Sequence, residues 1–236
     1  MHPSTKTARI AGCLYLVTVI ATPFLMIYVP ARLTVAGDAS ATMSRILANE
    51  SLFRAQIVVG LFSELCFIGA ILALYRLLHE VDRYLSALMV LLIMLVVPLA
   101  LLGSANELAM LTIVRGGKLL EVFDKPQRDA IAMLLINFDH YGVYVAELFW
   151  GLWLLPLGLL VRKCGFLPRW LGVWLVLNGV AYVILSFIGI AVPELAGRAL
   201  RYATPVLFGE AVLAIWLVVV GVRPRKSAGV SATATA

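Results

Sequence analysis

Charged residues are scarce in this sequence, and their scarcity excludes a soluble globular protein. Asp, Glu, Lys and Arg make up 14% of the 236 residues, whereas a typical soluble domain carries about 25%. Apolar residues make up 62%, an excess that one water-soluble globule cannot hide. The composition is typical of a membrane protein that crosses the bilayer several times.

Cysteine pairs and catalytic motifs are also lacking. The three cysteines, Cys13, Cys66 and Cys164, are odd in number and form no CxxC pair, which argues against a disulfide framework. The sequence contains no Walker loop, no GxSxG or GxGxxG motif, no HExxH motif, and no Glu-x-x-His pair on an apolar run. We therefore predict no metal site, and the sequence identifies no cofactor.

The positive net charge does not indicate a nucleic-acid partner. Nineteen Lys and Arg residues stand against thirteen Asp and Glu residues, giving a net charge of +6. The basic residues stand in short groups at the ends of apolar runs, which is their usual placement in membrane proteins. The expected partner is the lipid bilayer.

Six apolar runs are long enough to cross a bilayer, which takes about 20 residues per helix. Because an open strand in lipid leaves its backbone groups unpaired, we expect these runs to be helices. The predicted fold is all-α, a single domain (residues 1–226) that bundles six transmembrane helices with two interfacial amphipathic segments, 41–51 and 119–136. We expect residues 227–236 to be a disordered tail. The predicted spans are 10–29, 52–75, 84–114, 137–161, 168–192 and 203–222.

The distribution of basic residues predicts the orientation. Segments on the side of the two termini are short and basic, whereas those on the other side are longer and their basic residues are largely offset by acids. Cytoplasmic loops carry the excess of Lys and Arg, so we expect a plasma-membrane protein with both termini in the cytoplasm. The inner basic residues are Lys6, Arg9, Arg76, Arg83, Arg162, Lys163, Arg169, Arg223, Arg225 and Lys226.

Three glutamates lie at matched depth inside the apolar runs. Glu64 stands 12 residues before Arg76, Glu147 stands 15 before Arg162, and Glu210 stands 13 before Arg223. At about 1.5 Å per residue, all three lie about 18–22 Å from the inner boundary. A charge at the centre of a membrane costs about 2.5–3.5 kcal/mol on insertion scales, so such residues are candidates for function. We predict that the three glutamates form the bottom of a polar cavity that opens toward the outer side of the membrane.

Further polar residues extend this predicted cavity toward the outer surface. Glu107 and Asn106 lie near the outer end of their span, and Arg54 stands at an outer boundary with Arg115 and Arg201. Tyr144 and Glu147 follow His140 on one helix face, four and seven residues after it. The ligand-binding candidates are Glu64, Glu147, Glu210, Glu107, His140, Tyr144, Asn106 and Arg54.

Some polar and small residues have a packing explanation instead. Polar side chains within bundles often hydrogen-bond neighbouring helices, and we expect this of Asn178 and Ser186. Small residues four apart let helices approach closely. We expect such approaches at the pairs Gly69/Ala73 and Gly142/Ala146.

Several segments resemble a bacterial multi-pass membrane family catalogued as domain of unknown function 4386. They are ARIAGCLYL, VPARLTVAGDASATMSRILANESLFR, ALYRLLHEVDRYLSAL, GFLPRWLGVWLVLNGVAYV and FGEAVLAIWLVVVGV, which together cover nearly the whole chain. The resemblance implies six spans but supplies no reaction. The family's charged stretch early in the third span is replaced here by ALMVLLIMLVVP. The resemblance singles out Gly37, Asp38, Glu50, Arg54, Pro168, Arg169 and Glu210.

Three functions remain open from the sequence. The first is a membrane-embedded site that binds or moves a cation, a proton, a small molecule or a lipid headgroup. The second is a structural or regulatory subunit that contacts a membrane partner protein or further copies of itself through segments 41–51 and 119–136. The third is an intramembrane enzyme acting on a lipid or isoprenoid, with Glu147 or Glu210 as general acid or base.

Overall fold

The computed structural model describes residues 5–222, and this part of the chain is helical without any strand. The expectations for Arg223, Arg225, Lys226 and the tail lie outside the described residues. The elements are α1 (Thr5–Pro23), η1 (Phe24–Tyr28, a π-helix), α2 (Val29–Leu33), α3 (Ala39–Ala48), α4 (Glu50–Leu78), α5 (Arg83–Met94), α6 (Val96–Arg115), η2 (Lys118–Leu120, a 3₁₀ turn), α7 (Lys125–Cys164), α8 (Arg169–Ala191), α9 (Pro193–Leu207) and α10 (Gly209–Val219).

Six of the helical stretches are long and apolar enough to cross a membrane, which confirms the predicted class of fold. Large apolar side chains such as Ile20, Val58 and Leu65 are exposed along these helices. In a bilayer such side chains face lipid. The six stretches are Thr5–Leu33, Glu50–Leu78, Arg83–Arg115, Lys125–Cys164, Arg169–Ala191 and Pro193–Val219.

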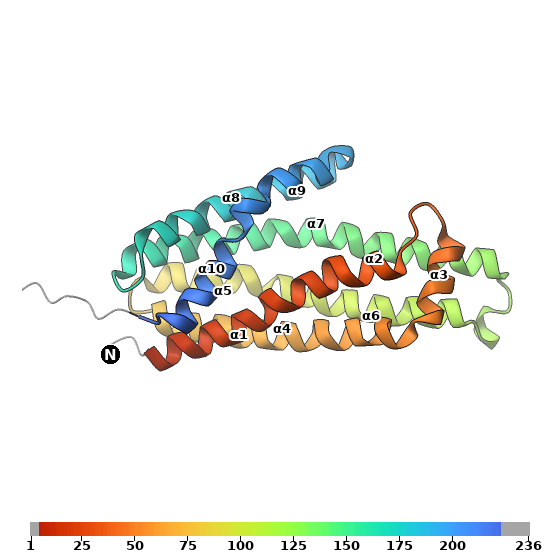
Figure 1. Cartoon of the computed structure of the whole chain (residues 1–236), viewed down its shortest axis with the longest axis horizontal. Helices are drawn as coiled ribbons and strands as arrows, with labels where there is room; N and C mark the ends of the chain where they lie inside the picture. Colours follow the sequence, from red (N-terminus) through yellow and green to blue (C-terminus); the bar gives the residue numbers. More distant parts are fainter. Residues whose placement is uncertain (1–4, 223–236) are drawn as a thin grey trace, which may run out of the picture.

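The first four stretches run side by side along the length of the molecule, and the last two lie against one side of them (Figure 1). α8 packs along α7, α9 returns along α8, and α10 turns away to pack against α1. Because the number of crossings is even, α1 begins and α10 ends at the same end of the molecule. We call this end the terminal end and the opposite end the distal end.

Two helical segments differ from their predicted extents. Residues 125–136 are the first turns of the 40-residue helix α7, and not a separate helix lying flat on the membrane. Asp124 and Gln127 form a reciprocal capping box that begins α7, which satisfies two backbone donors at its start. Residues 193–207, expected as a loop and the start of the last span, form the separate helix α9. Of the predicted segment 41–51, residues 41–48 lie in a short amphipathic helix, α3, whereas Glu50 and Ser51 already belong to α4.

Proline explains the break in the third span. α5 ends at Met94, Leu95 separates it from α6, and Pro98 stands four residues after Met94. Proline has no N–H to bond the carbonyl four residues earlier, and its ring clashes with that carbonyl. The chain therefore continues as a second helix, α6.

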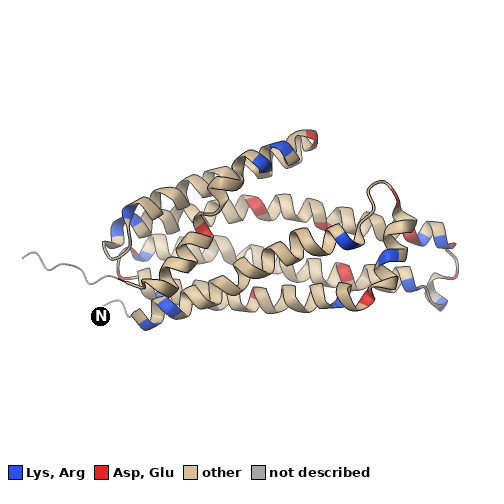
Figure 2. Cartoon of the chain, in the orientation of Figure 1, with Lys and Arg blue, Asp and Glu red and all other residues tan. Residues whose placement is uncertain are grey.

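Charge is distributed differently at the two ends (Figure 2). The terminal end carries the basic residues Lys6, Arg9, Arg76, Arg83, Arg162, Lys163 and Arg169, with the acids Glu80 and Asp82. The distal end mixes both signs: Arg32, Arg45, Arg54, Arg115, Lys118, Lys125 and Arg128 lie among Asp38, Glu50, Glu121, Asp124 and Asp129.

An ion pair at the terminal end should make the free energy of unfolding depend on pH. Lys163 Nζ donates to Asp82 Oδ2 at 2.8 Å, and this bond, followed by the Leu85 N–H, holds the pKa of Asp82 below its ordinary value. The bond stabilises the folded state at neutral pH and is lost as the pH falls through the lowered pKa of the folded state. We expect Lys163→Met to lower the thermal midpoint slightly at pH 7, and to lower it less and less as the pH falls through the lowered pKa of Asp82. Arg9→Met, at the same end, should not show this pH dependence.

Candidate functional site

The polar residue that the structure places best is Glu210, in the first turn of α10. Its carboxylate accepts a hydrogen bond from the hydroxyl of Tyr15, on α1. Tyr15 is 1% exposed, and its ring packs against Phe67 and Trp153 with centroids at 5.5 and 6.2 Å. This buried hydrogen bond joins the first and last helices of the described chain.

Side chains of α8 satisfy backbone carbonyls at the end of α9. Trp174 Nε1 donates to the carbonyl of Val206 at 2.9 Å, and Asn178 Nδ2 donates to that of Leu207 at 3.2 Å. Such bonds replace those that a broken helix loses inside a membrane. The expected interhelical hydrogen bond of Asn178 is therefore confirmed. Its Oδ1 atom, by contrast, is buried without a partner, and the residue is 0% exposed.

α7 and α8 approach so closely that their backbones touch. A Cβ atom on Gly151 would lie 2.5 Å from the carbonyl oxygen of Gly179, and one on Gly158 would lie 2.7 Å from that of Gly172. The expectation for Gly142 is wrong, because nothing lies within 4 Å of the Cβ that it lacks.

Glu147 and Tyr182 lie at the same level of this interface. Gly151 contacts Gly179 on one side of them. On the other side, Ser186 Oγ donates to the Tyr144 carbonyl at 2.7 Å, which also confirms the prediction for Ser186. Since the two helices are antiparallel, residues between these contacts face each other. The Tyr182 ring packs edge-on against Trp150, with centroids 6.0 Å apart.

Tyr182 lies near both half-buried carboxylates. It interacts electrostatically with both Glu147 and Glu210, and the Oε2 atom of Glu147 is buried without a hydrogen-bond partner. The residues Tyr15, Glu147, Asn178, Tyr182 and Glu210, from α1, α7, α8 and α10, form what we call the central polar cluster.

Glu64 stands apart from this cluster. It is half-buried on α4, and within residues 5–222 it has no hydrogen bond or ion pair and no interaction with Glu147 or Glu210. The structure thus brings two of the three predicted glutamates together around Tyr182 and leaves the third elsewhere at the bundle.

His140 and Tyr144 do extend from Glu147, as their spacing predicts. His140 Nε2 lies 2.9 Å from the hydroxyl of Tyr144, and Tyr144 interacts electrostatically with Glu147. His140 is exposed, so this row of side chains leads from the interior to the surface of α7.

Glu107 and Asn106 belong to a second group nearer the distal end. Gln56, on α4, donates to Glu107, and Glu107 also interacts with Asp139, on α7. Asn106 interacts with Asp139 and donates to the carbonyl of Leu135 at 2.9 Å. We call these four side chains (Gln56, Asn106, Glu107 and Asp139) the distal polar cluster.

Arg54 is engaged in an ion-pair network at the distal end. Its Nε atom donates to Glu50 Oε1 at 2.6 Å, and Arg115 also donates to Glu50. The carboxylate therefore joins the start of α4 to the end of α6. Arg54 is not part of either polar cluster.

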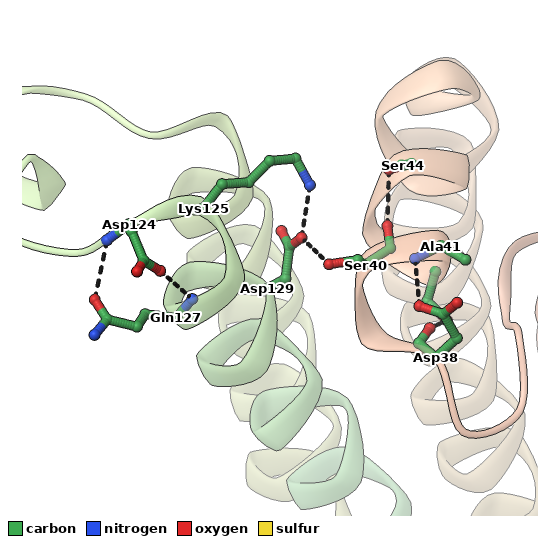
Figure 3. A network of polar contacts seen from close by, with 9 residues as sticks. Asp38, Ser40, Ala41, Ser44, Asp124, Lys125, Gln127 and Asp129 are labelled. Carbon is green, nitrogen blue, oxygen red and sulfur yellow. Dashed lines mark hydrogen bonds and ion pairs between the residues drawn. The ribbon is translucent and has the colours of Figure 1, made fainter.

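A further contact, which the sequence analysis did not identify, fastens α3 to α7 (Figure 3). Asp38 caps α3 by accepting from the backbone N–H of Ala41 at 2.8 Å. Ser40 Oγ and Lys125 Nζ then donate to the same carboxylate oxygen of Asp129, at 2.7 and 2.6 Å. Asp129 is 2% exposed. α3 also buries Thr42, Met43 and Ile46 against the bundle.

The predicted cavity remains a prediction. Two open surface pockets among the described residues lie elsewhere; one is lined by Thr5, Lys6, Arg9, Ile10, Cys13 and Leu14, and the other by Leu159, Arg162, Lys163 and Arg169. Within residues 5–222, no three His, Cys, Asp or Glu side chains gather as a metal ion requires.

The fold and its buried polar residues define a multi-pass helical membrane protein. The chain belongs to the family described as "Domain of unknown function (DUF4386)", whose model matches residues 10–221. A 74-residue segment is 34% identical to an uncharacterized protein of Archaeoglobus fulgidus and covers 31% of this chain and 43% of that protein. No solved structure matches the chain.

Proposed function

We propose that the protein binds a small cationic or hydrogen-bond-donating ligand at the central polar cluster and exchanges it with water on the distal side of the membrane. The observation that carries the proposal is the pair of buried acceptor atoms without partners, Glu147 Oε2 and Asn178 Oδ1. A buried acceptor without a hydrogen bond is costly, about 1–3 kcal/mol or more. A donor supplied by a ligand removes that cost.

The composition of the cluster determines the kind of ligand. Its members offer two carboxylates and one amide oxygen, and the hydroxyl of Tyr15 already donates to Glu210. A cation or a donor therefore complements the cluster, whereas an anion would be repelled. The row His140–Tyr144–Glu147 supplies a polar route from the surface of α7.

The orientation follows from charge. The terminal end is rich in Lys and Arg and has few acids, and such an excess marks the cytoplasmic side. We propose that both termini are cytoplasmic in the plasma membrane, which makes the distal end the outer end.

The proposal predicts charge movement when the ligand binds. Purified protein reconstituted on a solid-supported membrane should give a transient current after a concentration jump of at least one of three probes: H⁺, Na⁺ or methylammonium. The double variant Glu147→Gln/Glu210→Gln should reduce this current to that of protein-free membranes. Glu194→Gln, an exposed carboxylate on α9, is the matched control. If the wild type and the double variant respond alike to all three probes, the proposal is wrong.

A second function, that of a subunit in a membrane complex, is favoured by α9. No residue of this 15-residue helix is buried, and Figure 1 shows α9 and the end of α8 diverging from α7. In contrast, the two predicted docking segments contact each other within the protein, because α3 packs on the bundle and Ser40 donates to Asp129. Co-purification of a partner that is lost on substitution of α9 would support this function.

A further inference from the structure

We propose that the ligand of the central polar cluster is a proton, which Glu147 and Glu210 exchange through the hydroxyl of Tyr182. This inference rests on the proposed function and names its ligand. It follows from three observations: the arrangement of the three side chains, the lack of space between α7 and α8, and the polar groups that face each carboxylate.

Contacts of the residues that flank Tyr182 on α8 place it at the level of both carboxylates. On the side of α7, Gly179 contacts Gly151 and Ser186 contacts Tyr144. Tyr182 of α8 and Glu147 of α7 both lie between these two contacts, at the same level. Toward α10, the Asn178 amide lies 3.2 Å from the Cβ position of Gly209, the residue before Glu210. Side chains in a helix lean toward its N-terminus. Since α8 and α10 run in opposite directions, Tyr182 and Glu210 lean toward each other.

The close packing of α7 and α8 favours a proton over a larger ligand. Backbone atoms meet at Gly151 and Gly179, and the Cβ position of Gly189 lies 2.4 Å from the ring of Tyr144. Glu147 lies between these two contacts. An organic amine or a lipid headgroup would have to separate the helices, whereas a proton, with a water molecule where needed, fits the packing as it stands.

The groups that face each carboxylate are hydroxyls and not cations. Glu210 accepts a hydrogen bond from Tyr15 of α1 and interacts electrostatically with Tyr182 of α8. Glu147 interacts electrostatically with Tyr182 of α8 and with Tyr144 of its own helix. Neither carboxylate has an ion pair with Lys or Arg in the described chain, so no fixed positive charge competes with a proton.

The transfer is balanced without any further reactant. The Tyr182 hydroxyl makes no hydrogen bond among the described residues, so side-chain rotation first brings it into contact with both carboxyl groups. The protonated carboxyl of Glu147 then gives its proton to the Tyr182 oxygen while the phenolic proton of Tyr182 passes to the carboxylate of Glu210. Tyr182 is unchanged, Glu147 becomes a carboxylate, and Glu210 becomes a carboxylic acid. The Tyr15 hydroxyl still donates to the other oxygen of Glu210.

Infrared difference spectra between acid and alkaline buffer test whether these carboxyls exchange a proton. The protein is reconstituted in phosphatidylcholine vesicles, and the band of protonated carboxyl groups is compared in wild type, Glu147→Gln and Glu210→Gln. We expect each substitution to remove part of the band and to shift the titration midpoint of the remaining carboxyl by on the order of one pH unit. If neither substitution changes the band, the inference is wrong.

The role of Tyr182 needs its own variant. Tyr182→Phe keeps the ring against Trp150 and removes only the hydroxyl. In this background we expect Glu210→Gln to shift the Glu147 midpoint much less, whereas Tyr202→Phe, an exposed residue of α9, should leave the coupling unchanged. An equal shift with and without the Tyr182 hydroxyl would overturn its role as the intermediate.

These results separate the inference from the proposed function. If Na⁺ or methylammonium gives a current that depends on Glu147 and Glu210 while H⁺ gives none, the binding site stands and the proton inference fails. If none of the three probes gives such a current, the proposed function fails as well.

Discussion

Replacing Gly151 with leucine is expected to prevent α7 and α8 from packing and to leave little folded protein. The new Cβ would lie 2.5 Å from the carbonyl oxygen of Gly179 and 2.8 Å from the backbone nitrogen of Val183. Overpacking a core side chain costs about 1–3 kcal/mol. We expect at least the upper end of that range here, because backbone atoms cannot rotate away as side chains do.

The matched control is the same substitution elsewhere on the same helix. Nothing lies within 4 Å of the Cβ that Gly142 lacks, so Gly142→Leu should leave the fold intact. The measurement is the yield of monodisperse protein in size-exclusion chromatography, together with its thermal midpoint. Equal behaviour of the two variants would show that α7 and α8 are not in backbone contact.

Replacing Asp129 with alanine is expected to release α3 from the bundle. The carboxylate holds Ser40 of α3 and Lys125 of α7 on one oxygen, and a hydrogen bond to a charged group contributes about 1.5–3 kcal/mol. The side chain of Lys125 is 57% exposed, so its ammonium group stays hydrated in the variant. We therefore expect the loss of folding free energy to lie near the lower end of this range. Most of the loss should come from the contact with α3.

Hydrogen–deuterium exchange locates this effect. Amides of α3 should exchange much faster in Asp129→Ala than in wild type, whereas those of α10 should not change. Glu121→Ala removes an exposed carboxylate near the start of α7 and should have no effect on α3. Unchanged protection of α3 in Asp129→Ala would mean that the buried Thr42, Met43 and Ile46 hold this helix by themselves.

The sequence predicts the spans because their length and hydropathy are local properties. The start of α7 also has a local sequence signal. Asp124 and Gln127 stand at capping-box spacing, and Pro126 is suited to the first turn of a helix. Reading 119–136 as a flat helix missed that signal. α9 was missed because its arginines, its glycine and its two prolines are typical of a loop, although α8 supplies a helix for it to pack against.

The central polar cluster was only half predictable, for a physical reason. The shared depth in the membrane identified Glu147 and Glu210. It also selected Glu64, because depth alone does not separate a cluster member from a glutamate on another side of the bundle. Depth says nothing about the direction in which a side chain points around its helix. Tyr15 and Glu210 are 195 positions apart, and no local pattern joins residues so far apart. Tyr182 had a usable signal, because Asn178, Tyr182 and Ser186 repeat every four residues on one face of an apolar helix.

The meeting of α1 and α10 has a consequence for how the protein is made. The ribosome releases α1 into the membrane long before it has synthesised α10, so Tyr15 enters the bilayer while its acceptor does not yet exist. Thr5 and Gly221 adjoin in the finished fold, where a Cβ on Gly221 would lie 2.8 Å from the Thr5 side chain. The last helix therefore completes a hydrogen bond that the first helix lacks during synthesis, so the packing of α1 is finished only when the whole membrane domain has been made.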